Sequence, residues 1–347
     1  MNRITTSILT SLLCLCGINV WALEQDNNGV YQIGTSAELA EFATLVNEGN
    51  TGINAVLTSD IDFSANTEMI GVSDANPFRG TFDGNGHTIT LGYNTTTPYT
   101  GLFRFVNGVT IKNLILDGSI QSNQVHVGPV GANAAGNCTF SNILSAVNVT
   151  STIVGPTGDT GFVGLVSGTM TFNNCGFVGS INGESGTQYG AFVGYSFGGT
   201  SVVCNNCIVV AEFNGGTSNS RTFAFGDGTI SVNNCYYLNM IGAEQGTQMS
   251  AEQFASGEVC YLLNGDQSVI SWYQTIGEDA YPVLDESHQI VIFEDDKYAN
   301  PDGITEVTAD NSRQARDIYD LSGRKISPNP QLPKGIYIVN GKKIMVN

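Results

Sequence analysis

The sequence predicts an all-β chain: a parallel β-helix (β-solenoid) with short capping helices, followed by a small C-terminal β-sandwich domain. Three observations predict this fold. A short phrase ending in asparagine and an apolar residue occurs five times between residues 110 and 235, apolar and polar positions alternate around it, and the chain holds 42 glycines in 347 residues. A repeat period of about 20 to 50 residues is typical of stacked architectures, and alternation with a period of two indicates strands.

The repeated phrase aligns two columns that we expect to stack from coil to coil. Its copies are residues 110–114 (TIKNL), 139–143 (TFSNI), 171–175 (TFNNC), 203–207 (VCNNC) and 231–235 (SVNNC). Because neighbouring coils lie about 4.8 Å apart, the asparagines can form a ladder of amide hydrogen bonds. We place this structural ladder at a bend on the inner side of the coil, at intervals of 29, 32, 32 and 28 residues: Asn113, Asn142, Asn174, Asn206 and Asn234. The next column is the predicted core ladder: Leu114, Ile143, Cys175, Cys207 and Cys235.

A glycine motif precedes four of the asparagines by 12 to 16 residues. It reads GLFRFV from Gly101, GPVGAN from Gly128, GFVGLV from Gly161 and GAFVGY from Gly190. Glycine in this place predicts a tight corner with positive φ. In these phrases the chain resembles the GLUG-motif repeat proteins, which are bacterial surface and adhesin-like β-solenoids. Residues 77–90 (PFRGTFDGNGHTIT) resemble the entry segment ahead of such repeats.

Both ends of the solenoid require a cap, because an open coil exposes strand edges and core. Thr35 and Glu38 predict a capping box, followed by apolar residues at helical spacing: Leu39, Phe42, Ala43 and Val46. Ser250 and Gln253 predict a second helix that carries Phe254 and the apolar run 259–263, and residues 289–293 (QIVIF) read as a strand. Residues 248–303 resemble a segment found after GLUG-type repeats in Bacteroidetes surface proteins, which implies that they close the stack.

The two termini predict export. Residues 1–22 have the pattern of a cleavable signal peptide, with the cut between Ala22 and Leu23, so the solenoid with its N-terminal helix spans residues 23–247. In residues 304–347, alternating strands surround turns at Ser322-Gly323 and Asn340-Gly341. The phrases YDLSGRKI and KGIYIVNGKK resemble the type IX secretion (Por) C-terminal sorting domain of Bacteroidetes. That resemblance implies the type IX secretion machinery as partner through residues 304–347 and a cell-surface, outer-membrane-associated or extracellular location; a plain β-domain without sorting function is the alternative.

Charge excludes two classes of partner. The chain has a formal net charge of −18, and residues 23–303 hold 27 acidic but only 5 basic side chains. Such a body repels nucleic acid and anionic membrane surfaces. After residue 22 no apolar run reaches the roughly 18 residues of a membrane span, so we expect no transmembrane span in the mature chain.

Cysteine and carboxylate spacing predicts no metal and no cofactor. The mature chain keeps Cys138, Cys175, Cys204, Cys207, Cys235 and Cys260. The C-x-x-C at 204–207 could indicate redox or zinc chemistry, but these cysteines occupy positions that other coils fill with phenylalanine or leucine. We therefore expect buried free thiols, with disulfides between coils as the alternative. Four aspartates are candidate calcium ligands, but they lack the spacing of an EF-hand loop: Asp60, Asp62, Asp83 and Asp159.

No catalytic residue is predicted. The body's few cations are not accompanied by a dense carboxylate pair, and His87, His126 and His288 stand in no H-E-x-x-H motif. Asp60 and Asp62 share one side of a strand, where a structural turn is the simpler interpretation. The sequence therefore favours a secreted, surface-displayed, non-catalytic, adhesin-like protein that binds a host protein or a glycan. A carbohydrate-active enzyme, either a polysaccharide lyase or a glycoside hydrolase, is the alternative. Four aromatic side chains could stack on sugars: Tyr93, Tyr99, Tyr189 and Tyr195.

Overall fold

The computed structural model describes residues 23–155, 157–216, 219–265 and 267–301, and the tail residues 305–306, 318–320, 325–326, 334–339 and 342–346. The predicted signal peptide through Ala22 and both predicted tail turns lie outside these residues. Leu23, the first described residue, is buried in the solenoid core, with 8% of its surface exposed.

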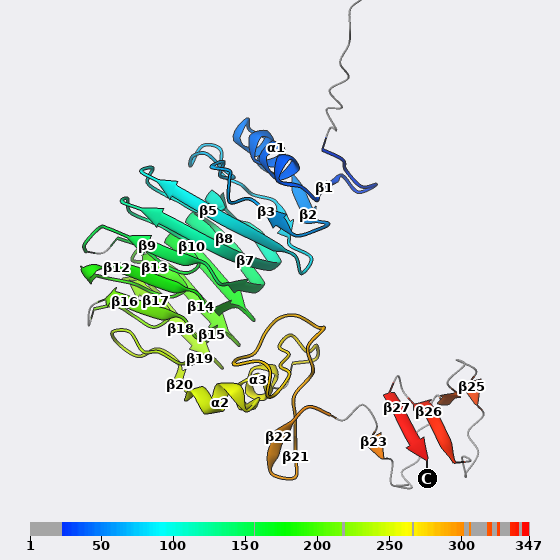
Figure 1. Ribbon diagram of the computed structural model, residues 1–347. Coiled ribbons are helices and arrows are strands. Elements are labelled where there is room, and N and C mark those ends of the chain that lie inside the picture. Colours follow the sequence, from blue (N-terminus) through cyan, green and yellow to red (C-terminus); the bar gives the residue numbers. More distant parts are fainter. Residues whose placement is uncertain are drawn as a thin grey trace, which may run out of the picture.

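Strands β1 to β20 form one hydrogen-bonded sheet that winds into a parallel β-solenoid of about six turns, which confirms the predicted fold class (Figure 1). The strands that open the sheet or lead up to the corner of the repeated phrase are β1 (Val30–Ile33), β2 (Asn54–Leu57), β4 (Thr81–Asp83), β10 (Val163–Asn173), β14 (Ser201–Asn205) and β18 (Thr229–Asn233). Two long strands run through that corner: β7 (Thr110–Ser122) contains Asn113 and β8 (Gly131–Ser145) contains Asn142. Those that follow the corner are β3 (Ile61–Asp62), β5 (Thr88–Thr95), β11 (Gly176–Phe177), β15 (Ile208–Val209), β19 (Tyr236–Tyr237) and β20 (Thr247–Gln248). The other faces use β6 (Phe103–Asn107), β9 (Asn148–Ser151), β12 (Ser180–Thr187), β13 (Val193–Ser196), β16 (Glu212–Gly216) and β17 (Ala224–Gly226).

The register places equivalent residues of the repeats on one another. Phe140 pairs with Phe172, which pairs with Cys204, and Leu114 pairs with Ile143. All five residues of the predicted core ladder point inward and are at most 3% exposed. Aromatic rings stack along the same core, with a centroid distance of 4.9 Å between Phe140 and Phe172. Apolar burial at every second position therefore specifies both the inward face and the register.

The glycine motif works differently from our prediction. None of Gly101, Gly128, Gly161 and Gly190 has a positive φ. A Cβ on Gly101 would lie 2.0 Å from the carbonyl oxygen of Gly128 on the next coil. These glycines are required because adjacent coils approach closely, and positive φ is adopted elsewhere in the coil.

Helix α1 (Ser36–Asn47) covers the first coil and begins at Thr35, whose side chain accepts a hydrogen bond from the Glu38 N–H at 3.2 Å. The capping box differs from the prediction in one bond, since the Glu38 carboxylate accepts from the N–H of Gly34. The predicted apolar face is buried against the core: Leu39, Phe42, Ala43 and Val46.

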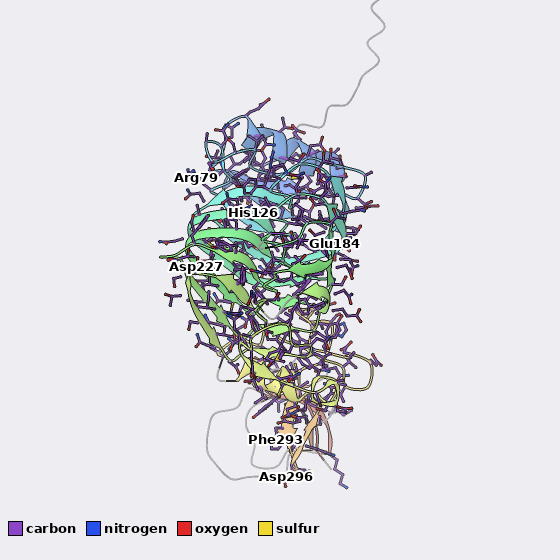
Figure 2. All side chains as sticks on the ribbon, turned by 90° about the vertical axis from the view of Figure 1, so that its left-hand side faces the viewer. Arg79, His126, Glu184, Asp227, Phe293 and Asp296 are labelled. Atoms are coloured by element: carbon purple, nitrogen blue, oxygen red, sulfur yellow. The ribbon has the colours of Figure 1, made fainter. Side chains whose placement is uncertain are left out.

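The segment after the last coil contains two helices where we predicted one. Helix α2 (Ala251–Ala255) has the predicted capping box of Ser250 and Gln253, and helix α3 (Glu258–Asn264) follows after Gly257, whose φ of 87° interrupts the helical path. The predicted strand over residues 289–293 begins only at Ile292: β21 (Ile292–Glu294) pairs with β22 (Lys297–Ala299) in an antiparallel hairpin. The labelled Phe293 and Asp296 mark this hairpin at the end of the molecule opposite α1 (Figure 2).

The last coil is closed mainly by the chain just before α2. The Gln245 side chain accepts hydrogen bonds from the N–H groups of Phe223 and Ala224 and donates one to the Ala224 carbonyl. Its amide thus bonds backbone groups that a further strand would otherwise pair with. Helices α2 and α3 form a second core with Trp272 and with the outward side chains of the corner strands, among them Ile208 and Tyr236. The described part of this segment, residues 248–265 and 267–301, thus covers the outer side of the last coils as well as following the final coil.

The described tail strands pair into one sheet in the order β23-β27-β26-β24-β25. They are β23 (Thr305–Glu306), β24 (Ile318–Asp320), β25 (Lys325–Ile326), β26 (Gly335–Val339) and β27 (Lys342–Val346). Within the described parts of the chain, no helix has the length and apolar character needed to cross a membrane.

Candidate ligand-binding groove

The asparagine column marks a left-handed corner of the backbone. All five predicted residues have φ between 49° and 54°, and Asn85 on the preceding coil has φ 51°. Asparagine is among the few non-glycine residues that tolerate this conformation, because its short amide bonds locally. Backbone geometry therefore explains why the residue recurs. We missed Asn85 because its phrase, TFDGNG, has a glycine where the other copies have the asparagine.

The corner asparagines are less buried than we predicted. Asn113, Asn142, Asn174 and Asn206 are half-buried, and Asn234 is exposed. They lie on the edge between two strands, so one side of each amide faces outward. The column is consequently available to contact groups outside the solenoid core.

Amide bonds join two of the four steps in this column. Asn142 Nδ2 donates to Asn113 Oδ1 at 3.0 Å, and Asn234 Nδ2 donates to Asn206 Oδ1 at 2.8 Å. Asn174 Nδ2 instead donates to the Ser271 hydroxyl at 3.1 Å. The Oδ1 atoms of Asn142 and Asn174 are buried without a hydrogen-bond partner in the described chain. Buried polar atoms normally have a partner, so the amide ladder is incomplete at these two residues.

A more regular amide ladder runs one residue earlier. Asn205 Nδ2 donates to Asn173 Oδ1 at 2.9 Å, and Asn233 Nδ2 donates to Asn205 Oδ1 at 3.0 Å. The doubled asparagine in the last three copies of the phrase was the sequence signal for this ladder. The ladder chemistry that we predicted is therefore continuous in the neighbouring column.

The chain's own C-terminal segment covers the corner of the last coils. Trp272 Nε1 donates to the Asn206 carbonyl at 3.1 Å, and Asn234 Nδ2 donates to the Leu262 carbonyl at 2.9 Å. Gly176 makes room for the indole, since a Cβ there would lie 3.2 Å from the Trp272 ring. The corner therefore forms hydrogen bonds with hydroxyl, N–H and carbonyl groups of a segment that lies outside the solenoid coils.

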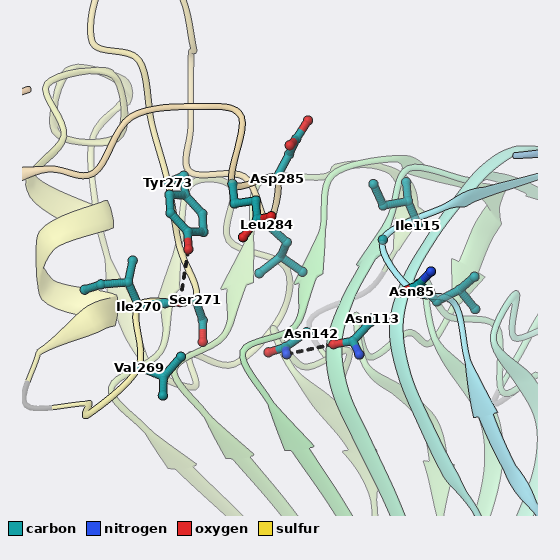
Figure 3. Close-up of a pocket in the computed structure, with 13 residues that line it drawn as sticks. Asn85, Asn113, Ile115, Asn142, Val269, Ile270, Ser271, Tyr273, Leu284 and Asp285 are labelled. Carbon is teal, nitrogen blue, oxygen red and sulfur yellow. Dashed lines mark hydrogen bonds between the residues drawn. The ribbon is translucent and has the colours of Figure 1, made fainter. Parts of the chain in front are cut away.

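The corner of the earlier coils stays open and forms one wall of a groove of about 470 Å³. Asn85, Asn113 and Asn142 lie along this wall (Figure 3). The other wall is formed by Tyr273 and by residues 269–271 and 284–286. Val269 is 71% exposed and Ile270 41% exposed at its edge. The groove thus combines amides with a small apolar surface.

The groove carries negative charge. Asp285 and Glu286 line it, and its described lining includes no lysine, arginine or histidine. A hydrogen bond from the Ser287 N–H holds the pKa of Asp285 below its usual value. Such a site disfavours anionic ligands and suits neutral groups that bind amide and carboxylate oxygens.

The histidines and aspartates considered as catalytic or metal-binding candidates from the sequence have mainly structural contacts. His87 Nδ1 lies 3.2 Å from Asp60, and His288 Nδ1 lies 2.7 Å from Asp279. His126 stacks on Tyr99 at 5.0 Å, and burial lowers its pKa. Asp62 accepts hydrogen bonds from the Ser64 N–H and hydroxyl, so Asp60 and Asp62 serve separate turns.

Two of the four proposed sugar-stacking tyrosines are buried. Tyr93 is 2% exposed and bonds the Glu68 carbonyl, and Tyr189 is fully buried and bonds the Asn214 carbonyl. Tyr99 packs on Phe105 as well as on the histidine. Tyr195 keeps a partly exposed ring, and its hydroxyl donates to Asp227 at 2.9 Å. Of the four, only Tyr99 and Tyr195 keep accessible surface.

All six cysteines of the described residues are buried free thiols. Burial raises the pKa of Cys207 well above its usual value, and the neighbouring Cys175 raises it further. A thiol so strongly held in its neutral form is a poor nucleophile and metal ligand. The described chain also has no group of three or more His, Cys, Asp or Glu placed to hold a metal ion.

Comparison with known proteins supports the fold. A solved structure described as "a putative immunoglobulin A1 protease from Bacteroides ovatus" superposes with a TM-score of 0.51 at 14% sequence identity. The match covers 75% of this chain and 93% of that chain. No family model matches the sequence, and no curated protein matches it. At this identity the likeness concerns the β-solenoid architecture alone.

Proposed function

We propose that the protein is an exported, cell-surface-displayed, non-catalytic binding protein of adhesin-like type, and that the groove at the asparagine corner binds an uncharged glycan. The contact between Asn174 and Ser271 carries this proposal. It is a hydroxyl bound by a corner amide, one coil away from Asn142, which lines the open groove. Asn142 Nδ2 uses one of its two N–H groups on Asn113, so a ligand hydroxyl can accept the other.

The charge and shape of the groove favour a glycan over an acidic partner. Carboxylates and amides are good acceptors for sugar hydroxyls, and the exposed Val269 and Ile270 offer an apolar contact for a sugar face. The acidic body repels sulfated and uronate polymers at this site. The proposal therefore specifies neutral saccharides.

Binding fits the groove better than catalysis. Asp285 and Glu286 are the carboxylates of its lining, and a lyase would need a cationic base beside them. The solved neighbour is described as a putative protease; in the described part of this chain the imidazoles of His87 and His288 contact aspartates but have no hydrogen bond to a serine hydroxyl or a cysteine thiol, and His126 stacks on a ring. A carbohydrate-active enzyme is the alternative that an assay of depolymerisation tests.

A matched pair of variants tests the binding proposal. Asn142→Gly removes the groove amide while retaining the left-handed backbone, and Asn206→Gly makes the same change under Trp272, outside the groove. On an array of neutral and acidic glycans, we expect the wild type and Asn206→Gly to bind the same neutral glycans and Asn142→Gly to lose them. Equal binding by both variants, binding of host proteins without glycans, or release of reducing ends would each contradict the proposal.

Export is proposed on the signal-peptide pattern of residues 1–22 and on the resemblance of residues 304–347 to type IX sorting domains. Deletion of residues 304–347 is expected to leave the protein in the periplasm, measured by cell fractionation and surface labelling. Unchanged surface display of the truncated chain would contradict the sorting function.

A further inference from the structure

A second cavity, separate from the groove, lies beside the end of helix α1. It measures about 280 Å³ and is bounded by Asn47, by residues 67–72, by residues 93–97 and by Arg104. It shares no lining residue with the groove. Its chemistry can therefore be tested independently.

Arg104 brings a positive charge to this cavity without a carboxylate to balance it. Its Nη2 donates to the Pro98 carbonyl at 3.2 Å, and its guanidinium lies 5.6 Å from the centroid of the Phe105 ring. No carboxylate of the described residues forms an ion pair with it, and its Nε is a buried atom without a hydrogen-bond partner. Partly buried guanidinium groups are normally paired. Arg79 and Arg221 likewise form no ion pair among the described residues, and Arg104 differs from them in its buried, unpartnered Nε.

Apart from Arg104, the cavity is lined by neutral side chains, while the neighbouring Glu68 carboxylate accepts a hydrogen bond from the Thr67 N–H at 3.2 Å. Asn47 accepts from the Gly71 N–H and donates to the Met69 carbonyl, and the Tyr93 hydroxyl donates to the Glu68 carbonyl. These contacts hold the floor of the cavity in place. Around it, the hydroxyl and amide side chains of the lining come from Thr67, Asn94, Thr95 and Thr97.

We propose that this cavity is a binding site for a carboxylate-bearing sugar, such as a uronic acid residue of a glycan. The Arg104 guanidinium pairs with the carboxylate through its remaining N–H donors, and the threonine and asparagine side chains bind ring hydroxyls. Arginine suits this role because its planar donors match the geometry of a carboxylate. The site complements the groove, since it accepts the anionic sugars that the groove repels.

Long-range attraction cannot produce binding here. An acidic body repels a carboxylate at a distance, so affinity depends on the local guanidinium contact and on its exclusion of water. The neutral counterpart of the same sugar is therefore expected to bind much more weakly.

The test uses the full chain with D-glucuronate, D-glucose and acetate as probes, measured by titration calorimetry and by ligand-observed NMR. We expect glucuronate to bind about tenfold or more tightly than glucose or acetate. Arg104→Gln is expected to lose that preference. Arg79→Gln makes the same charge change at an exposed arginine (Figure 2) and should bind as the wild type does. Arg104→Lys keeps the charge without the planar donors and should bind with intermediate affinity, which covers the case in which Arg104→Gln does not fold.

Three results would overturn the proposal. Equal loss in Arg79→Gln and Arg104→Gln would show a general charge effect. Equal affinity for acetate and glucuronate would show an anion site that does not select sugars. Loss of glucuronate binding in Asn142→Gly would place the sugar in the groove, whereas retention there supports the second site.

Discussion

Asp159 lies inside the solenoid, where a carboxylate is costly. Its backbone bridges to Tyr189 on the next coil, and the residue is fully buried. The Thr157 hydroxyl donates to Oδ2 at 2.6 Å, while Oδ1 has no partner in the described chain. Burial raises the pKa of Asp159 from 3.8 to about 6. We predict that Asp159→Asn stabilises the protein at neutral pH, because it removes the ionised form.

The size of the effect follows from the pKa difference. A shift from 3.8 to about 6 corresponds to about 3 kcal/mol between the protonation states. Because the folded-state pKa is raised, the carboxyl group's contribution to stability is fully present below about pH 4 and is lost as pH rises through 6. Asp159→Asn should therefore gain up to about 3 kcal/mol over the wild type at pH 8, less the cost of placing its N–H donors. Near pH 4 this gain should vanish.

Guanidinium unfolding followed by circular dichroism at several pH values measures the difference between wild type and variant. Other titrating groups, including the buried His126, cancel in that difference. Asp74→Asn, at an exposed aspartate, is the matched control and should show a difference near zero at every pH. A difference between wild type and Asp159→Asn that does not change from pH 4 to pH 8 would refute the reasoning.

Three other predictions follow from the coil geometry. Asn206→Ala should lower the free energy of unfolding by about 1–2 kcal/mol relative to Asn206→Gly, because both lose the amide but only alanine is strained at φ 54°; equal unfolding midpoints would contradict this. Gly101→Ala should destabilise by about 1–3 kcal/mol through its contact with the Gly128 carbonyl, whereas Gly198→Ala, in open space, should have little effect on thermal unfolding. Thiol titration of the denatured, unreduced mature protein should find six free cysteines, and a smaller number would indicate disulfides between coils.

The sequence allowed the fold and its register to be predicted, because apolar burial constrains every second position of a strand. Phe140, Phe172 and Cys204 stack as their alignment indicated. The sequence did not reveal why asparagine recurs at this position of the repeated phrase. An amide ladder and a left-handed corner both favour asparagine at one phase of the coil, and only backbone angles distinguish them.

The groove could not be predicted, because it depends on where a segment without repeats folds back. Ser271 contacts Asn174 across 97 residues of sequence, and no periodic signal in residues 248–303 indicates that partner. Arg104 was visible as one of only five cations in the body. The absence of an ion pair at Arg104 among the described residues could be seen only in the folded chain.

The C-terminal segment determines how much of the corner is open. From Asn174 to Asn234, a hydroxyl, an indole N–H and backbone carbonyls of the chain itself contact the corner, and from Asn85 to Asn142 the same kind of corner faces the groove. From Asn85 to Asn234 the corner geometry repeats through a left-handed asparagine, so these coils carry the same amide whether or not it contacts a ligand. Selectivity must then come from the wall that does not repeat. In this protein that wall includes Asp285 and Glu286, and the preference for uncharged ligands that we propose depends on the negative charge that they add to a row of neutral amides.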